Sequence, residues 1–267
     1  MTDREKNGLK GPVKSCAGAI TRWSYQPDGS LAEAQHRNPD GSEWTTQYVY
    51  GEAGRLSEAR SQFGVLTYHY APGGELDHVT SGERLVESWS GDEQGRKTRT
   101  LYLEAAAEGA TSITTVYDEA GRLIEEAQHA ALPAGMLEKM GPEQVEAVQA
   151  LFVGRWKRLH RYDADGRRVE TTTDFGLLGG ERMTLEYNEH GDEVERMVVE
   201  STRELSLDEK GRPIEPDQPP AERRFEVRQE YQYDEHGNWT ERVVSSRPNP
   251  DEAFAVTNTE RRTLDYY

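Results

Sequence analysis

Short runs of alternating apolar and polar residues fill most of this chain, and each run ends at a glycine-containing turn. Side chains that alternate with a period of two point to opposite faces of an extended strand. The apolar positions are mostly aromatic, and in the clearest runs they are Trp44, Thr46, Tyr48 and Tyr50 before Gly54, Leu66, Tyr68 and Tyr70 before Gly74, and Phe225, Val227, Tyr231 and Tyr233 before Gly237. The pattern predicts β-strands with one aromatic face.

The turns form an internal repeat in which a tyrosine stands four residues before a glycine. The pairs are Tyr25/Gly29, Tyr50/Gly54, Tyr70/Gly74, Tyr117/Gly121, Tyr162/Gly166, Tyr187/Gly191 and Tyr233/Gly237. Degenerate copies at Gly95 and Gly211 bring the number of units to nine. Repetition at this spacing determines the fold more strongly than any single residue does.

The residue types within each unit indicate a hairpin turn. Aspartate opens the turn and glycine closes it, which is typical of a type I turn followed by a left-handed residue, with a bulge at the glycine. Only glycine adopts a positive φ without steric cost. We therefore predict structural turns at Gly29, Gly54, Gly74, Gly121, Gly166, Gly191 and Gly237. The apolar residue two or three places later is expected to pack across the strand pair against the tyrosine.

Return turns between the units are predicted where glycine, proline and asparagine recur. They fall at Asn38-Pro39-Asp40-Gly41, Phe63-Gly64, Ser81-Gly82, Glu108-Gly109 and Gly179-Gly180. Each unit is then a hairpin, and the units follow one another along the chain.

The copies at Gly121, Gly166 and Gly237 resemble the repeats of the bacterial rearrangement-hotspot (RHS) or YD-repeat family. Its hallmark is tyrosine-aspartate, two variable residues, and glycine followed by arginine or asparagine. The resemblance covers roughly Trp23 to Thr240 and implies an antiparallel sheet of strung hairpins. Large members coil into shells that hold a toxin, but nine units and the lack of an aspartate-proline-x-glycine element argue against encapsulation here. The chain is more similar to short, solitary YD-repeat proteins.

The predicted fold is all-β with one short helix: a single twisted antiparallel sheet of β-hairpins, for which an open roll and a closed barrel are alternatives. Residues 1–267 are expected to form one domain, with a helical insertion at about 128–154 and a proline-rich loop at about 213–220. The helix is predicted from Pro142 to Phe152, where Val145, Val148, Leu151 and Phe152 share one face. A last strand, Thr257 to Tyr267, is expected to close the sheet or to pair near Val13.

The charge balance narrows the possible partners. Among 267 residues, 49 acids outnumber 32 lysines and arginines, and the formal net charge is −17. Such a field repels nucleic acid and anionic lipid. No apolar run is long enough for a membrane span, and no signal-peptide core is visible, so the prediction is a cytoplasmic protein, or an exported one if a signal has been removed. The single cysteine, Cys16, is interpreted as an inert strand residue.

The sequence contains no obvious catalytic motif, and no cofactor or metal is predicted. The seven histidines are scattered, and His190 and His236 occupy equivalent turn positions. His69 and His78 flank one hairpin turn and can face each other, but two ligands make a weak site. Asp163 to Gly166 matches only part of a calcium loop, because Arg161 and Thr172 stand where acidic ligands are needed.

The aromatic row remains as the candidate functional feature. Its first role is packing within the sheet, and the accessible part suits a protein segment or a sugar. The expectation is a non-catalytic binding or scaffold module whose partner is another protein. The alternative is a carbohydrate-binding or carbohydrate-active protein with an acid pair, and a third possibility is β-augmentation at an open sheet edge. The candidate binding residues are Trp44, Tyr48, Tyr50, Tyr68, Tyr70, Tyr231, Tyr233 and Trp239.

Overall fold

The computed structural model describes residues 2–103, 111–129, 141, 156–203, 206–207, 213–214 and 219–267. In this part of the chain, nineteen strands form one antiparallel sheet and two more form a small separate one. The first strands are β1 (Val13–Ala17), β2 (Thr21–Tyr25), β3 (Leu31–Arg37), β4 (Glu43–Tyr50), β5 (Leu56–Ser61), β6 (Gly64–Tyr70), β7 (Leu76–Ser81), β8 (Arg84–Gly91), β9 (Lys97–Tyr102), β10 (Ser112–Tyr117) and β11 (Leu123–His129).

The remaining strands are β12 (Lys157–Tyr162), β13 (Arg168–Asp174), β14 (Gly179–Tyr187), β15 (Glu193–Thr202), β16 (Ser206–Leu207), β17 (Pro213–Ile214), β18 (Ala221–Tyr233), β19 (Trp239–Arg247), β20 (Ala255–Arg261) and β21 (Thr263–Tyr266). The described helices are short: α1 (Asp3–Lys6) and the 3₁₀ turns η1 (Glu52–Gly54) and η2 (Gly176–Leu178). None of the described helices has the length and hydrophobicity to cross a bilayer. The all-β prediction is confirmed.

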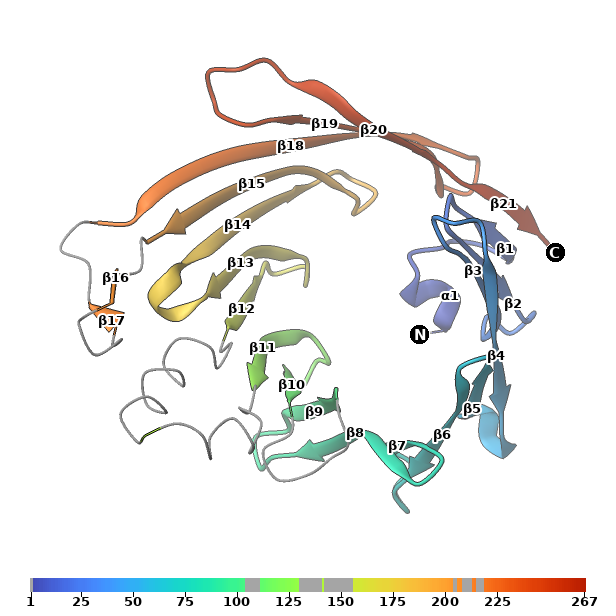
Figure 1. Ribbon diagram of the computed structural model, residues 1–267. Helices are drawn as coiled ribbons and strands as arrows, with labels where there is room; N and C mark the ends of the chain where they lie inside the picture. The colour runs from blue at the N-terminus through green and yellow to red at the C-terminus, as the bar shows by residue number, and fades with distance from the viewer. Residues whose placement is uncertain are drawn as a thin grey trace.

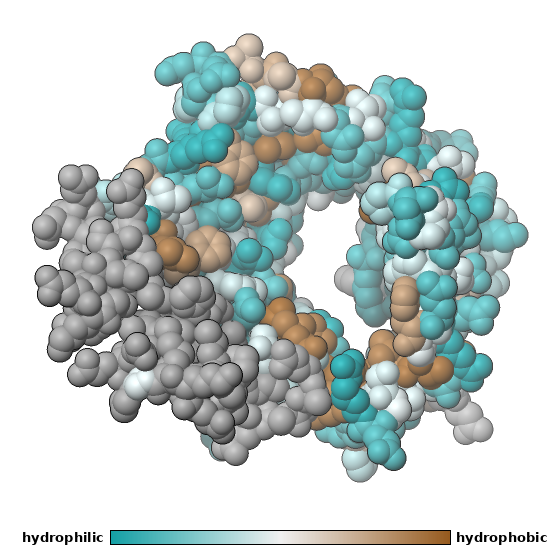
Figure 2. Space-filling model, in the orientation of Figure 1, coloured by the Kyte–Doolittle hydropathy of each residue, from teal (hydrophilic) through white to brown (hydrophobic). Residues whose placement is uncertain are grey.

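The sheet curls until its two ends meet, so the strands form a ring (Figure 1). Strand β20 pairs with β19, and β21, which follows it directly, pairs with β1 with Val13 opposite Tyr266 and Cys16 opposite Leu264. The expectation that the last strand pairs near Val13 is therefore confirmed. Figure 2 shows an opening through the middle of the ring. Closure satisfies the backbone groups that an open sheet would expose at its edges.

Successive antiparallel strands place alternate turns on opposite rims of the ring. Eight described turns share one geometry: the seven of the Tyr-x-x-x-Gly type and the degenerate copy at Gly95. Each joins an even-numbered strand to the strand that follows it, so all eight lie at the same rim, which we call the glycine rim. In each, the N–H of the residue after the tyrosine donates to the carbonyl four residues on, as from Asp118 to Arg122, and the glycine N–H donates back, as from Gly121 to Asp118. Each of these glycines has a positive φ. The opposite rim carries the return turns.

Two local expectations need correction. The ladder irregularity lies after the glycine rather than at it, because Tyr117 pairs with Leu123 and Val116 pairs with Glu125. The Gly179-Gly180 return turn is wrong: both glycines begin β14, and η2 makes the turn. A side chain at Gly179 would meet the Ser201 carbonyl oxygen, so glycine is required there by close strand contact.

The two expected interruptions lie largely outside the described residues. Of the helical insertion at 128–154, Gln128 and His129 end strand β11 instead, and the Pro142–Phe152 helix is not among the described residues. Of the proline-rich loop, Pro213 and Ile214 form β17, which pairs with β16. The glutamate-glycine return turn at 108–109 and the degenerate unit at Gly211 are also outside the described part.

Apolar burial is concentrated where the ring closes. Leu9, Val13, Cys16 and Tyr25 form a buried cluster, and the partly buried side chains packed against it are Trp23, Leu31, Leu264 and Tyr266. Elsewhere many buried side chains are small or polar, as at Ala34, Ala59, Thr115, Thr171 and Thr173. A single curved layer leaves room for only a thin core, as the low apolar content predicts.

Candidate binding site

The N-terminal segment identifies which sheet face lines the ring. Helix α1 lies inside the ring beside β1 to β4 (Figure 1). The hydroxyl of Tyr50 donates to Asp3 at 2.9 Å, and the side-chain amide of Asn7 donates to the hydroxyl of Tyr25 at 2.7 Å. The face that bears these two tyrosines is therefore the inner face, which we call the inner wall.

Strand alternation and register extend the inner wall to the other candidate residues. Trp44 and Tyr48 share the face of Tyr50 in β4. Tyr48 lies opposite Ala59, which lies opposite Leu66, and Tyr68 follows on the same face. The structure thus brings Trp44, Tyr48, Tyr50, Tyr68 and Tyr70 together on adjoining strands. Tyr231, Tyr233 and Trp239 form a second group on β18 and β19.

In the first group, Trp44 packs against neighbouring rings, whereas Tyr48 and Tyr68 remain partly accessible. The Trp44 ring stacks on His36 with 4.0 Å between centroids and meets Phe63 edge-on at 5.4 Å. Tyr48 and Tyr68 are half-buried, and burial raises the pKa of both hydroxyls. These rings offer apolar surface with a polar tip.

The second group lies near the strands that close the ring. Tyr231 is 6.0 Å from Tyr233 and 6.3 Å from Trp239, measured between ring centroids. His190 stacks on Tyr233 at 4.2 Å. Burial and a hydrogen bond to the Asp192 carboxylate raise the pKa of Tyr233 to about 12.

The repeated tyrosines have a structural role that sequence reasoning did not reveal. Four of them donate through the hydroxyl to the backbone carbonyl two residues after the glycine of the preceding turn, and Tyr231, two residues before the repeat tyrosine Tyr233, makes the same bond, all at 2.7–2.9 Å. These bonds join Tyr50 to Leu31, Tyr70 to Leu56, Tyr162 to Leu123, Tyr187 to Arg168 and Tyr231 to Glu193. These five units are therefore tied to the units before them. The regular tyrosine spacing is the signal that could have predicted this bond.

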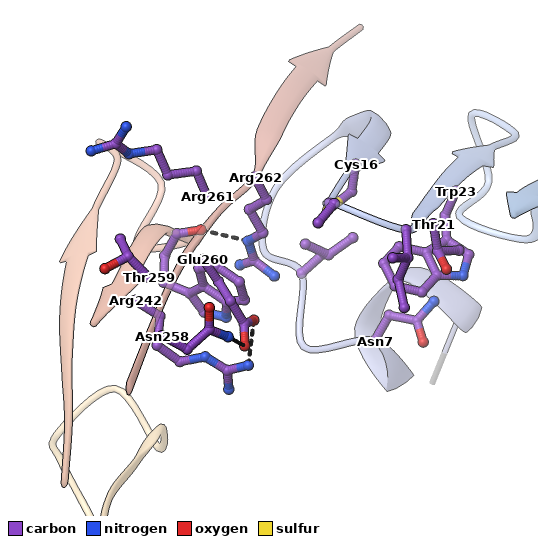
Figure 3. Close-up of a pocket in the computed structure, with 15 residues that line it drawn as sticks. Asn7, Cys16, Thr21, Trp23, Arg242, Asn258, Thr259, Glu260, Arg261 and Arg262 are labelled. Atoms are coloured by element: carbon purple, nitrogen blue, oxygen red, sulfur yellow. Dashed lines mark hydrogen bonds and ion pairs between the residues drawn. The ribbon is translucent and has the colours of Figure 1, made fainter. Parts of the chain in front are cut away.

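A pocket of about 800 Å³ lies where the chain ends meet, and we call it the seam pocket (Figure 3). One side is apolar and includes Leu9, Cys16, Ile20 and Trp23 from the N-terminal segment and β1 to β2. Its other side comes from β19 to β21 and includes Trp239, Arg242, Asn258, Glu260 and Arg262. Of the predicted binding residues, Trp239 alone lines it.

The two arginines Arg242 and Arg262 of the seam pocket differ in their hydrogen-bond partners. Arg242 donates to Glu260 at 2.5 Å and to Gln229 at 3.2 Å. The guanidinium of Arg262 lies 3.9 Å from the Trp239 ring and donates through Nε to the Trp239 carbonyl. Burial lowers the pKa of Arg262 and raises that of the neighbouring Cys16 thiol. No short-range sequence motif marks these arginines, and this is why sequence reasoning missed them.

The histidines make local contacts. His69 and His78 face each other across β6 and β7 with ring centroids 4.3 Å apart, as the sequence suggested. His160 bridges the Thr171 hydroxyl at 3.0 Å and the Glu126 carboxylate at 3.2 Å, and burial lowers the pKa of His160. Thr171 is only 3% exposed, so this trio is closed to a substrate. Within the described ranges, no three metal-ligating side chains gather closely enough to hold an ion.

Comparisons with known proteins add little. No family model matches the chain, and no curated protein matches it. Among solved structures, a porin-like protein from Bacteroides uniformis ATCC 8492 aligns over 96% of this chain and 98% of its own, at 10% identity and a TM-score of 0.32. A similarity this low supports no functional argument. The resemblance to YD-repeat proteins stays a prediction.

Proposed function

We propose that the protein is a non-catalytic binding module whose inner wall holds an extended segment of another protein. The observation that carries this proposal is that the inner wall already holds a polypeptide, its own residues 2–12. Their contacts come from both backbone and side chains: Arg4 Nη1 donates to the Val13 carbonyl at 3.2 Å, and the Lys10 N–H donates to Asn238 Oδ1 at 2.7 Å. Asn238 also donates to the Lys10 carbonyl at 2.8 Å.

The interior offers the mixture of groups that peptide recognition uses. Tyrosine and tryptophan supply rigid apolar area with a hydrogen-bonding tip. Beside them lie paired charges, such as Glu87, which accepts from both Trp89 and Arg99 at 2.6 Å. A polar, aromatic wall of this kind suits a segment that carries its own side-chain donors and acceptors.

The acids beside the tryptophans favour binding over glycoside hydrolysis. A cleft at Trp89 contains Glu75 and Asp77, but Glu75 binds Lys97 at 2.7 Å and Asp77 binds His78 at 2.7 Å. The hydrogen bond from Lys97 lowers the pKa of Glu75. A general acid needs the opposite shift. In the seam pocket at Trp239, the lining acid Glu260 is bound to Arg242.

A carbohydrate ligand is the second candidate, and the aromatic cluster at Trp44 is the observation in its favour. Phe63, which meets Trp44 edge-on, is 72% exposed. Exposed aromatic faces stack on sugar rings, so this cluster would form the first subsite.

The two candidates can be separated with one pair of variants. Thr46→Arg places a long cation on the inner wall beside Tyr48, whereas Thr45→Arg places it on the outer face of the same strand. The full chain and both variants would be screened against a displayed library of random dodecapeptides and against a glycan array. We expect enriched peptides whose affinity falls at least about tenfold in Thr46→Arg and is unchanged in Thr45→Arg, because only the first blocks the interior.

Glycan binding without peptide enrichment would contradict the proposal of a protein ligand and support the carbohydrate candidate. Peptides that bind Thr46→Arg and Thr45→Arg equally well would place recognition outside the ring and contradict the proposal. Circular dichroism and thermal melting of both variants would verify that the fold survives, and Tyr68→Phe provides a milder inner-wall change in the same assay.

A further inference from the structure

Arg262 occupies an unusual position in the ring. It stands between β20 and β21, where the chain leaves its pairing with β19 and begins pairing with β1. Its N–H still donates to the Thr240 carbonyl at 3.0 Å. Its side chain points into the seam pocket between the two halves of the closure (Figure 3).

The guanidinium of Arg262 is incompletely paired. Its Nε donates to the Trp239 carbonyl, but among the described residues neither terminal nitrogen has a hydrogen bond or ion pair. Asp192 and Asp234 attract it without forming an ion pair. Arg242 forms an ion pair with Glu260, and the third lining arginine, Arg261, binds Glu241 at 2.5 Å. Of the three arginines that line the pocket, Arg262 is therefore the one without an ion pair to any described residue, in a chain of net charge −17.

The wall across from Arg262 is apolar and accessible. Leu9 and Trp23 belong to or pack on the buried cluster, whereas Ile20 is 68% exposed and lines the pocket. The volume of about 800 Å³ lies within the range of small-molecule sites. A ligand that fills this space must combine an apolar body with an anionic end.

We propose that the seam pocket binds an apolar carboxylate, with the carboxylate on the terminal nitrogens of Arg262 and the apolar body along Ile20 and Trp23. Arginine presents two parallel donors that match the two oxygens of a carboxylate. Such a ligand also offsets the cost of burying an unpaired guanidinium. This site does not depend on the peptide-binding proposal, because it lies at the ring closure and uses different residues from Thr46 and Tyr48.

Calorimetry with decanoate and decan-1-ol tests the proposal on the full chain at neutral pH and low salt. The two probes share an apolar tail and differ in the anionic end. We expect decanoate to bind at least about tenfold more tightly than the alcohol, since a charged hydrogen-bonded pair is worth more than a neutral one. Arg262→Gln should remove this preference. Arg261→Gln, the same change on the exposed neighbour, should keep it.

The apolar half of the proposed site is tested with a matched pair of variants. Ile20→Gln should weaken decanoate binding several-fold, whereas Leu178→Gln, at another exposed apolar residue that does not line the pocket, should not. A short peptide ending in leucine, compared with its C-terminal amide, distinguishes the sources of the carboxylate: preference for the free acid indicates that a peptide end can occupy the site.

Equal affinity for decanoate and decan-1-ol would overturn the proposal, as would equal losses in Arg262→Gln and Arg261→Gln. Thermal melting checks that Arg262→Gln still folds, since its Nε bond to the Trp239 carbonyl is lost. If that variant unfolds, the proposal is tested by the two probes with the parent chain and by the comparison of Ile20→Gln with Leu178→Gln.

Discussion

The glycine rim repeats one turn geometry eight times in the described chain, whereas the connections of the opposite rim differ in length and form. At the glycine rim, an aspartate or its substitute opens each turn, and in several units a tyrosine hydroxyl forms a hydrogen bond to the preceding unit. The opposite rim has a short link at Phe63 and the η2 turn, and the stretches of sequence between β11 and β12 and between β15 and β18 are longer.

The two rims therefore have different structural roles. The repeated rim helps to set strand register, because the tyrosines that tie the units must reach a fixed carbonyl in the neighbouring unit. The variable rim can lengthen without disturbing that register, since antiparallel strands need only a connection that reaches across about 5 Å. One opposite-rim turn, Asn38 to Ser42, nevertheless has the glycine-rim hydrogen bonds, so the geometry itself is not confined to one rim.

The largest expected effect lies on the variable rim. A Cβ at Gly179 would lie 1.9 Å from the Ser201 carbonyl oxygen, so Gly179→Ala forces β14 and β15 apart. We expect a loss of about 3 kcal/mol or more in the free energy of unfolding, measured by urea denaturation. Gly64→Ala is the control, because Gly64 also has a positive φ but its nearest neighbour would be 3.8 Å away. Equal losses would show that backbone conformation, and not strand contact, decides this position.

On the glycine rim the expected effect is smaller and purely conformational. Gly121 has a φ of 77° and open space around it, so Gly121→Val costs only the strain of a β-branched residue in the left-handed region. We expect about 1–3 kcal/mol. Gly73→Val is matched, since Gly73 has equally open space without the positive φ, and should change the unfolding free energy by less than about 0.5 kcal/mol. An unchanged melting temperature in Gly121→Val would contradict the turn assignment.

The comparison also shows what sequence can predict. Each glycine-rim turn lies within seven residues, so its aspartate, glycine and tyrosine are visible together. Pairing of the last strand with the strand at Val13 could be predicted as one outcome, because an alternating final strand needs a partner and the first strand has a free edge in the sequence-based picture. The ladder irregularity and Gly179 were missed because both depend on how close the neighbouring strand lies, which no local pattern records.

The seam pocket could not be predicted for a related reason. Trp23 and Arg262 come from opposite ends of the chain, and they meet only because the ring closes. The aromatic row was predictable as a face, but its division into two groups follows from the curvature of the sheet. Arg262 points inward because the strand changes partner there, and the sequence around it reads like an ordinary strand.

The third test concerns the bonds that join the repeated units. Tyr162→Phe removes the 2.7 Å hydrogen bond to the Leu123 carbonyl and keeps the ring. We expect a loss of about 1 kcal/mol in the free energy of unfolding. Tyr68→Phe is the control, because no hydrogen bond of the Tyr68 hydroxyl is found within the described residues. If both variants lose the same stability, the bond between units adds nothing beyond ring packing.

The smallest expected effect is a pH dependence of the glycine rim. Asp163 accepts from the Arg167 N–H and side chain, and these bonds lower the pKa of Asp163 below its ordinary 3.8. A lowered pKa means stabilisation that is present above the unfolded value and is lost as the pH falls through the folded one. Asp163→Asn keeps the turn acceptor, as Asn188 does naturally at the equivalent position by accepting from the His190 and Asp192 N–H groups. The melting temperature of Asp163→Asn should therefore be lower than that of the parent chain at pH 7, and the two melting temperatures should converge below pH 3.8. A difference that persists unchanged at acidic pH would show that the Asp163 charge contributes nothing to the turn.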